Sequence, residues 1–375
     1  MNNYFVHTFE LSYRTTLDDI LELTDHKLAN INGEYKSTKY TDRGLTIVSR
    51  KCKKEGKDGK GNHKLILIVN PSKLIEPGTF SNNITCGDDF EMALVILDRM
   101  ISHLFTELEL DDFKLSRIDI TNDIHNVPES IIQGYILIMR KMSLSRGYRP
   151  NTELEENTPE FRCEDSFNVC NVSQGAEFVV YNKHRASIDQ GYPQEVLYSF
   201  EETMRVELRC SRRYINRKTK GLSTSDALLF MYLSRADLVK EFYDAMFRYR
   251  TDLCYVSERW QGLLIEKWFG GKKKAKKLID YIKKLSEMDI HSETALYDSY
   301  NTKKVRIRTP SVLNDIGFSP IPIQQDTVSY MSPLDTVLGF TDKKVKDKCY
   351  RIIKHSKGRK KVIFRYEDYR LSYYS

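Results

Sequence analysis

The sequence predicts an α+β protein: an antiparallel sheet with helices packed on one face, followed by a mainly helical, basic C-terminal region. Three observations predict this class. Short runs rich in β-branched and aromatic residues alternate apolar and polar side chains, as half-buried antiparallel strands do. Longer segments repeat apolar residues at helical spacing. The charge is also divided, because residues 1–210 sum to −8 and residues 211–375 to +15, which recovers the net +7.

The N-terminal part begins with two strand patterns and a helix pattern. Residues 4–11 are rich in β-formers, and residues 65–69 form an apolar run that Pro71 soon interrupts. An amphipathic helix is expected from Asp88, with Glu91 three residues later in a capping-box arrangement and an apolar stripe beyond it.

The later segments are mostly helical in pattern. A helix is expected over 128–142, because proline is favoured in a first turn, and an acidic exposed loop over 153–160. Residues 224–248 are helical in pattern with a break at Ser234, and residues 272–284 form a lysine-rich helix pattern. No internal repeat is visible in the sequence.

Three strand-like runs carry charged residues on one side. Residues two apart share a face of a strand. The polar sides are Arg117, Asp119, Thr121 and Asp123 in residues 115–124, Tyr181 and Lys183 in residues 178–183, and Thr203, Arg205, Glu207 and Arg209 in residues 203–210. For any one run, ion pairing across a solvated sheet face would explain the pattern. The coincidence of three such runs favours a site.

These residue types together have a chemical interpretation. Converging carboxylates bind hard cations such as Mg²⁺ or Mn²⁺, which polarise a phosphodiester. A tyrosine can attack phosphorus as a covalent nucleophile, a lysine can stabilise the charge that develops, and arginines suit phosphate oxygens. The set could therefore cut a DNA strand and hold its 5′ end as a phosphotyrosine.

At these residues the chain resembles the replication initiators of filamentous phages, and more distantly the Rep_trans-type plasmid initiators and conjugative relaxases. These proteins open rolling-circle replication by nicking one DNA strand at an origin. The resemblance spans about residues 65–225. Its ordered motifs are residues 69–74 (VNPSKL), 115–119 (LSRID), 180–184 (VYNKH), 205–209 (RVELR) and 213–214 (RY).

The resemblance implies a rolling-circle Rep nuclease-like fold and roles for individual residues. Tyr181 matches the nucleophile, Lys183 the lysine two residues after it, and Asp119 and Glu207 the carboxylates that hold the metal. Asp123 is added to the metal set because it shares a face with Asp119. The chain contains no His-x-His pair, which suits a carboxylate-based site.

Phosphate contacts are expected from both parts of the chain. The candidates are Arg117, Arg205 and Arg209 on the strands and Lys272, Lys273 and Lys274 in the basic region. Further basic clusters lie at 303–308 and 354–361, and Trp260, Trp268, Tyr281 and Tyr350 could stack on bases. We expect a nicking domain over 1–215 and a DNA-binding domain over 216–375. His125 and His184 could be metal ligands, phosphate contacts or ordinary hydrogen-bonding residues.

We therefore expect a metal-dependent rolling-circle initiator that nicks and rejoins single-stranded or supercoiled origin DNA and works with a host helicase and polymerase. The alternative is a non-catalytic initiator that melts the origin and recruits host enzymes. A tyrosine recombinase is disfavoured because its Arg…His-x-x-Arg…Tyr order is absent, and residues 270–274 do not form a P-loop. No membrane span or secretory signal is visible, and seven cysteines without metal-site spacing favour the cytoplasm.

Overall fold

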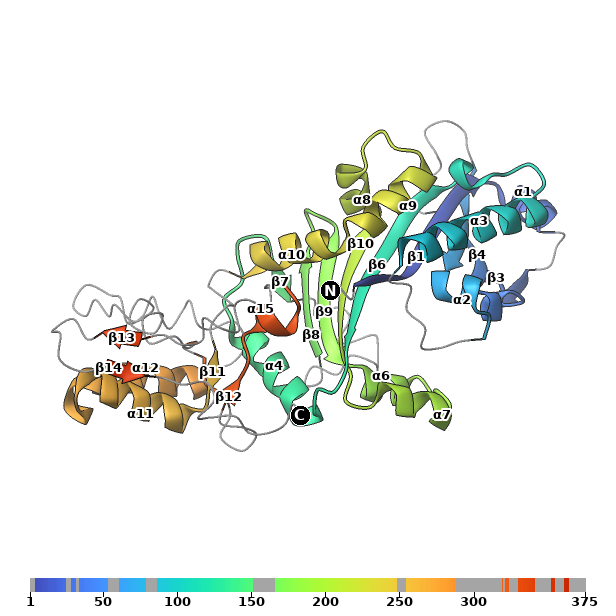
Figure 1. Ribbon diagram of the computed structural model, residues 1–375. Helices are drawn as coiled ribbons and strands as arrows, with labels where there is room; N and C mark the ends of the chain where they lie inside the picture. The colour runs from blue at the N-terminus through green and yellow to red at the C-terminus, as the bar shows by residue number, and fades with distance from the viewer. Residues whose placement is uncertain are drawn as a thin grey trace.

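The computed structural model describes residues 4–24, 28–31, 34–52, 61–78, 86–150, 166–247, 254–287, 319, 321–323, 330–340, 352–354 and 361–363. It is an α+β protein built on one large antiparallel sheet (Figure 1). The expected acidic loop at 153–160 and the basic cluster at 303–308 lie outside these residues, as does most of 354–361. Within the described part of the chain, no helix has the length and apolar composition needed to cross a membrane.

The large sheet has ten strands in the order β2-β3-β4-β5-β1-β6-β10-β9-β8-β7. Their bounds are β1 (Phe5–Thr15), β2 (Ala29–Ile31), β3 (Glu34–Ser37), β4 (Leu45–Lys51), β5 (His63–Val69), β6 (Lys114–Ile124), β7 (Arg149–Pro150), β8 (Ser166–Asn171), β9 (Ala176–Asn182) and β10 (Met204–Ser211). The strands expected from the sequence correspond to β1, β5, β6, β9 and β10, the last three of them predicted by alternation. β4 and β8 were not expected, although both pair with predicted strands.

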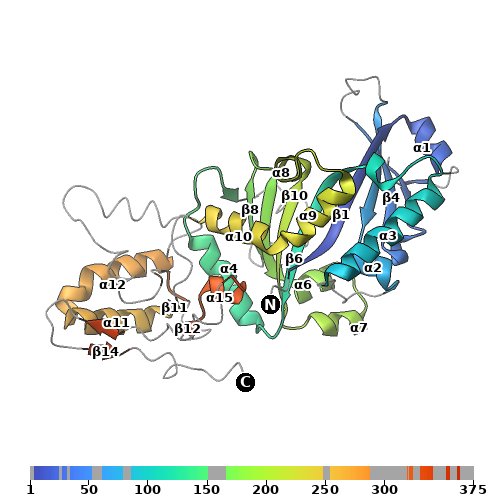
Figure 2. The same ribbon diagram turned by 45° about the horizontal axis from the view of Figure 1, so that its top comes forward.

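Helices cover one face of this sheet. They are α1 (Leu17–Leu23), α2 (Pro71–Ile75), α3 (Gly87–Leu104), α4 (Glu129–Lys141), α8 (Arg212–Lys218), α9 (Thr224–Leu233) and α10 (Arg235–Met246). Figures 1 and 2 both show α3, α9 and α10 lying across the same side of the sheet. Ile118 and Leu208 of the strands join Leu97 of α3 and Tyr135 of α4 in one buried core. The opposite face is called the open face below; α6 (Lys183–Asp189) and α7 (Gln194–Leu197) project from one end of the sheet.

Two details of the predicted helices were tested directly. The break at Ser234 is confirmed, because α9 ends and α10 begins around it. The capping box at Asp88 is wrong: α3 begins one residue earlier, behind Cys86, whose side chain makes no capping hydrogen bond. Short 3₁₀ turns are η1 (Thr41–Arg43), η2 (Leu110–Asp112) and η3 (Tyr198–Phe200).

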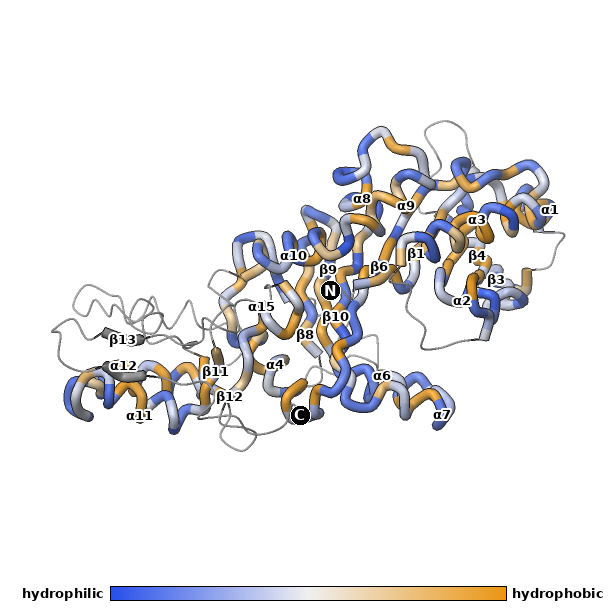
Figure 3. The backbone as a smooth tube through the Cα atoms, in the orientation of Figure 1, coloured by the Kyte–Doolittle hydropathy of each residue, from blue (hydrophilic) through white to orange (hydrophobic). Residues whose placement is uncertain are grey.

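A second, smaller core is built around a helix pair. The helices α11 (Glu258–Phe269) and α12 (Lys272–Glu287) are joined through Gly270 and Gly271, and Figure 3 shows hydrophobic and hydrophilic residues alternating along both. Leu264, Ile265, Leu278 and Ile282 are buried between them. The remaining elements are β11 (Tyr255–Val256), β12 (Tyr330–Met331), α15 (Leu334–Val337), β13 (Ile352–Lys354) and β14 (Lys361–Ile363).

The main core extends well beyond residue 215. Residue 215 lies inside α8, and Leu228, Tyr243 and Leu338 belong to the same buried cluster as the sheet. The second core begins near Val256. The boundary expected at 215/216 therefore falls within the main core, because α8 to α10 cover the sheet.

The order of elements along the chain repeats once. The first repeat is β1-α1-β2-β3-β4-β5-α2-α3, and the second is β6-α4-β7-β8-β9-β10-α8-α9, with α6 and α7 inserted between β9 and β10. Reading outward from the centre of the sheet, β1-β5-β4-β3-β2 on one side matches β6-β10-β9-β8-β7 on the other. Because β1 and β6 are antiparallel neighbours, a pseudo-two-fold axis perpendicular to the sheet relates the repeats.

The register of the central pair agrees with this axis. Val69 pairs with Leu45 and Phe9, as Cys210 pairs with Ala176 and Ile118. Phe9 is therefore equivalent to Ile118, and these two residues pair with each other. The irregularities in this ladder fall at His7 and Ser116, which the same axis relates.

The turns before β4 and β9 are related by the pseudo-two-fold axis and share one geometry. Gly44 and Gly175 precede β4 and β9 with φ of 79° and 73°. Each carbonyl accepts a 2.8 Å hydrogen bond from the residue before the next helix, Asn70 in the first repeat and Ser211 in the second. The sheet is therefore two copies of one unit. The sequence hides this because equivalent residues on the open face differ in chemistry.

Replacing Gly44 with alanine should lower the free energy of unfolding by about 2–5 kcal/mol. A left-handed backbone disfavours a side chain by roughly 1–2 kcal/mol, and overpacking adds roughly 1–3 kcal/mol. The new Cβ would lie 2.5 Å from the Asn70 carbonyl oxygen. Gly78→Ala is the matched control, since φ is 82° there but no atom lies within 4 Å. Urea unfolding measures the free energy of unfolding of both variants. Equal losses in the two would show that the close approach to Asn70 adds no cost.

Candidate functional site

The three strands with polar sides lie side by side in the second repeat. β10 pairs with β6 on one side and with β9 on the other. One cross-strand row contains Asp123, Arg205 and Tyr181, and the row at the other end contains Asp119, Arg209 and Glu177. Glu207 lies between these rows. Sheet pairing alone therefore gathers most of the predicted site residues on the open face.

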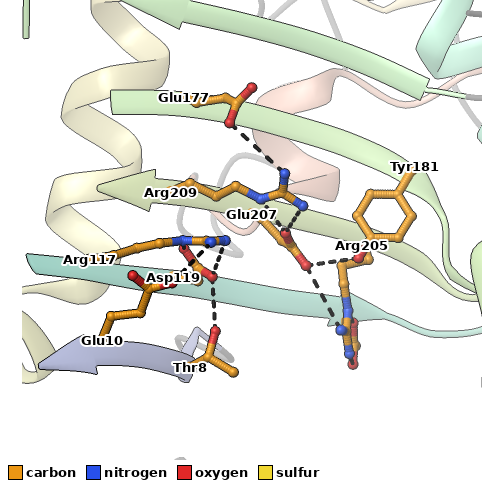
Figure 4. A network of polar contacts seen from close by, with 10 residues as sticks. Thr8, Glu10, Arg117, Asp119, Glu177, Tyr181, Arg205, Glu207 and Arg209 are labelled. Carbon is orange, nitrogen blue, oxygen red and sulfur yellow. Dashed lines mark hydrogen bonds and ion pairs between the residues drawn. The ribbon is translucent and has the colours of Figure 1, made fainter. Parts of the chain in front are cut away.

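Asp119 lies at the junction of the two repeats. Arg117 donates to both of its carboxylate oxygens, at 2.9 and 2.7 Å, and the Thr8 hydroxyl donates to one of them at 2.9 Å (Figure 4). Arg117 also lies 3.5 Å from a carboxylate oxygen of Glu10. Burial raises the pKa of Asp119, and the neighbouring charge of Arg117 only partly offsets this effect.

Asp123 and Arg205 form a buried, two-pronged ion pair. Arg205 Nε and Nη2 donate to the two oxygens of Asp123 at 2.5 and 2.6 Å. The two side chains are only 4% and 3% exposed. Burial acts to raise the pKa of Asp123, but the charge and hydrogen bonds of Arg205 outweigh it, so the pKa falls below its ordinary value.

Glu207 is the hub of the network. It accepts a 2.8 Å hydrogen bond from the Tyr181 hydroxyl on one oxygen and bonds of 3.0 and 2.8 Å from Arg209 on the other (Figure 4). Arg205 lies 3.9 Å from the first oxygen. Although burial acts to raise the pKa of Glu207, the positive charges of Arg209 and Arg205 lower it to about 2. Burial and the Glu207 charge raise the pKa of the Tyr181 phenol well above 10.

Lys183 is not in the strand where the alternation placed it. β9 ends at Asn182, whose side chain caps α6 by accepting from Arg185 N at 3.2 Å, so Lys183 opens that helix. Its buried Nζ lies 5.5 Å from the ring centre of Tyr192 and 4.9 Å from that of Phe200. Such cation–π contacts hold the ammonium at the α6 end of the site.

The two histidines near the motifs have different surroundings. His125 Nδ1 lies 3.1 Å from the hydroxyl of Thr203, which is an ordinary hydrogen-bond distance. His184 follows Lys183 in α6 and is half-buried. The geometry described for His125 is that of a hydrogen-bonding residue.

The basic candidates of the C-terminal region lie apart from this network. Lys272, Lys273 and Lys274 are exposed in the first turn of α12. Trp260 and Trp268 pack partly buried against the second core, and Tyr281 is buried within it. Tyr350 lies outside the described residues. These three described aromatics therefore contribute to the helix-pair core.

The predicted metal ligands can be tested by their donor chemistry. Asp119, Asp123 and Glu207 would bind Mg²⁺ or Mn²⁺ through carboxylate oxygens. Every one of those oxygens already accepts from an arginine, a threonine or the tyrosine. Among the described residues, no three His, Cys, Asp or Glu side chains are grouped to hold a metal. The arrangement is therefore an arginine–carboxylate network that does not fit a divalent cation.

Four contributors were missing from the sequence-based set. Thr8 and Glu10 lie in a predicted strand whose polar alternation could have revealed them, and Glu177 lies 3.9 Å from Arg209. His7 sits at the β1 irregularity, and burial together with the charge of Arg205 lowers its pKa to about 3. An irregularity of this kind re-aims a side chain and leaves no signal in the alternation.

Comparison with known proteins adds no family to these observations. A scan against models of known protein families and a search of curated proteins both find no match.

Proposed function

We propose that this chain is a rolling-circle replication initiator that nicks and rejoins origin DNA, with a sheet of the rolling-circle nuclease type and Tyr181 as its nucleophile. The observation that carries the proposal is the 2.8 Å hydrogen bond from the Tyr181 hydroxyl to Glu207, between Arg205 and Arg209. A nucleophile within hydrogen-bond reach of a carboxylate base, beside groups that bind phosphate, is the arrangement that strand transfer needs.

The proposed step moves one proton and exchanges one bond to phosphorus. Tyr181 Oη attacks the phosphodiester, the phenol proton passes to Glu207, and the P–O3′ bond breaks. The leaving 3′ oxygen takes up this proton from Glu207, which gives a free 3′-OH and a 5′-phosphotyrosine and returns Glu207 to its ionised form. Arg205 and Arg209 stabilise the charge on the non-bridging oxygens. Attack by a 3′-OH reverses the step and rejoins the strand.

Burial sets a condition on this step. The Tyr181 side chain is only 6% exposed, and Ala186 of α6 belongs to the same small buried cluster. A phosphodiester can therefore reach the Tyr181 hydroxyl only if side chains that bury it move aside. The raised pKa of the Tyr181 phenol and the lowered pKa of Glu207 both oppose this proton transfer, so the proposed step requires Arg205 and Arg209 to move from Glu207 towards the phosphate.

The wider reaction needs DNA and host enzymes. The exposed lysines of α12 carry charge that can follow a phosphate backbone. We infer that a host helicase unwinds the duplex while a host polymerase extends the 3′-OH, and that the chain acts in the cytoplasm.

A non-catalytic origin-binding protein is the second candidate. The observation that favours it is the pairing of every site carboxylate with an arginine, which is also how a purely structural network would be built. In that case the protein would melt the origin and recruit host enzymes without forming a covalent bond to DNA.

Covalent capture separates the two candidates. The purified protein is mixed with single-stranded and with supercoiled origin DNA, and protein–DNA adducts are resolved under denaturing conditions. We expect an adduct at Tyr181 and a nicked circle. Binding without any adduct on either substrate would favour the second candidate.

The same assay tests the predicted Mg²⁺ or Mn²⁺ requirement. Because arginines already neutralise the three carboxylates, we expect adduct formation to persist in EDTA. As a control, adding Mn²⁺ back should leave both the rate and the adduct position unchanged. Complete loss in EDTA, restored by Mn²⁺, would show that the carboxylates rearrange around a cation.

A further inference from the structure

The pseudo-two-fold axis gives each residue of the proposed site a counterpart in the first repeat. Val69 is equivalent to Cys210, Leu45 to Ala176, and Phe9 to Ile118. A two-fold axis perpendicular to a sheet keeps each residue on its own face. The counterparts of the site residues therefore lie on the same open face, at the other end of the same sheet.

Counting along the strands from these anchors identifies the counterparts. Asp123, Arg205 and Tyr181 form one row of the site, and the equivalent row is Arg14, Lys64 and Arg50. Lys64 pairs with Arg14 on one side and with Arg50 on the other. A row that holds an acid, a base and a tyrosine in the second repeat holds three cations in the first.

The row concentrates positive charge on one face of the sheet. Arg50 is exposed, and Arg14 and Lys64 are half-buried; Arg14 Nε donates a 3.2 Å hydrogen bond to the Gly61 carbonyl. Lys36 of the neighbouring β3 pairs with Val48 and adds a fourth cation to the same face. Four cations on one face attract a polyanion.

The separation of the two rows suits a DNA strand. Asp123 lies five residues beyond Ile118 and Arg14 five residues beyond Phe9, in opposite directions along antiparallel strands. At about 3.3 Å per residue, the rows are about 33 Å apart along the strand direction. That length corresponds to at most about ten nucleotides, because 3.4 Å is the spacing of stacked nucleotides in duplex DNA.

We propose that the row of Arg14, Lys64 and Arg50, with Lys36 beside it, binds the phosphate backbone of the DNA strand that crosses the open face to the site of the second repeat. This inference rests on the proposed function because it takes the bound polyanion to be the DNA strand that is nicked. The binding itself requires no reaction. In this proposal the first repeat binds DNA, and the second repeat carries the residues that react with it.

The test measures binding alone, so it does not depend on nicking or on the origin sequence. Fluorescence anisotropy follows a labelled single-stranded oligothymidylate of about 20 nucleotides, which exceeds the roughly ten that span the face. The variant carries Arg14→Gln, Arg50→Gln and Lys64→Gln. Since each single-strand phosphate contact contributes about 0.7 to the slope of log K against log salt, we expect the slope to become shallower by about 2.

The matched control removes the same charge elsewhere. Arg99→Gln, Arg217→Gln and Lys220→Gln replace exposed cations on or beside the helices α3 and α8. This variant should keep the wild-type slope. An unchanged slope in the first variant, or an equal change in both, would overturn the proposal. A shallower slope combined with no covalent capture would reject the nicking function and retain the binding surface.

The wild-type protein allows a second test, which does not depend on the triple variant folding correctly. Acetylation of lysines, read by mass spectrometry with and without the oligothymidylate, compares Lys64 with Lys220. We expect DNA to protect Lys64 and to leave Lys220 reactive. Equal reactivity of Lys64 in both conditions would contradict the proposal even if the triple variant failed to fold.

Discussion

Replacing Tyr181 with phenylalanine is expected to abolish covalent capture of DNA while the protein still folds and binds. The change removes one oxygen atom, which is both the proposed nucleophile and the 2.8 Å donor to Glu207. Loss of that hydrogen bond should lower the free energy of unfolding by only about 1 kcal/mol, because Arg209 still pairs with the carboxylate. Adduct yield, oligonucleotide affinity and urea unfolding measure the three quantities.

The matched control is Tyr214→Phe. Tyr214 is equally buried but lies in α8, on the helical side of the sheet, and it also falls within a motif of the resemblance. This variant should form adducts as the wild type does. Adducts at wild-type yield in Tyr181→Phe, or an adduct mapped to another tyrosine, would remove Tyr181 from its proposed role.

Replacing Arg205 with alanine is expected to lower the free energy of unfolding by about 3–5 kcal/mol, which is the usual cost of leaving one partner of a buried ion pair alone. Asp123 would remain in a place where its side chain is 4% exposed. Urea unfolding of the variant measures the loss. The double variant Arg205→Met with Asp123→Leu should recover most of it, because no charge is then left unpaired.

Arg117→Ala provides the comparison on the same sheet. Arg117 also pairs with an aspartate through two hydrogen bonds, but its side chain is 42% exposed. We expect a smaller loss of about 1–3 kcal/mol, because Asp119, whose side chain is only 7% exposed, loses both hydrogen bonds from Arg117 but keeps the one from Thr8. If Arg205→Ala costs no more than Arg117→Ala, burial does not decide the strength of these pairs.

Local patterns predicted the sheet and its helices well. Alternation identified β6, β9 and β10, and helical spacing identified α3, α4 and the pair α9 and α10, so the α+β class with a large antiparallel sheet is confirmed. The same alternation predicted that Asp119, Glu207 and Tyr181 share a face, which the pairing of three adjacent strands provides. The signal was strong because the core-facing side of each strand is mostly apolar.

What the sequence could not supply depends on register and on turns. Which acid meets which arginine follows from pairing Asp123 with Arg205, residues far apart in the chain. The position of Lys183 follows from Asn182 acting as a helix cap, a signal that was present in the sequence but was outweighed by the strand pattern. The repeat was invisible because Arg14 and Asp123 are equivalent in place and opposite in charge.

The central position of β1 has a consequence for how the chain is made. β1 precedes the other strands of this sheet in the sequence and pairs with β5 of the same repeat, so half of the sheet can form before β6 is synthesised. Its other edge, eleven residues long, stays open until β6 is available. An unpaired strand of that length is a template for aggregation. The pairing of β6 with β1 therefore also covers this open edge and limits aggregation of partly synthesised chains.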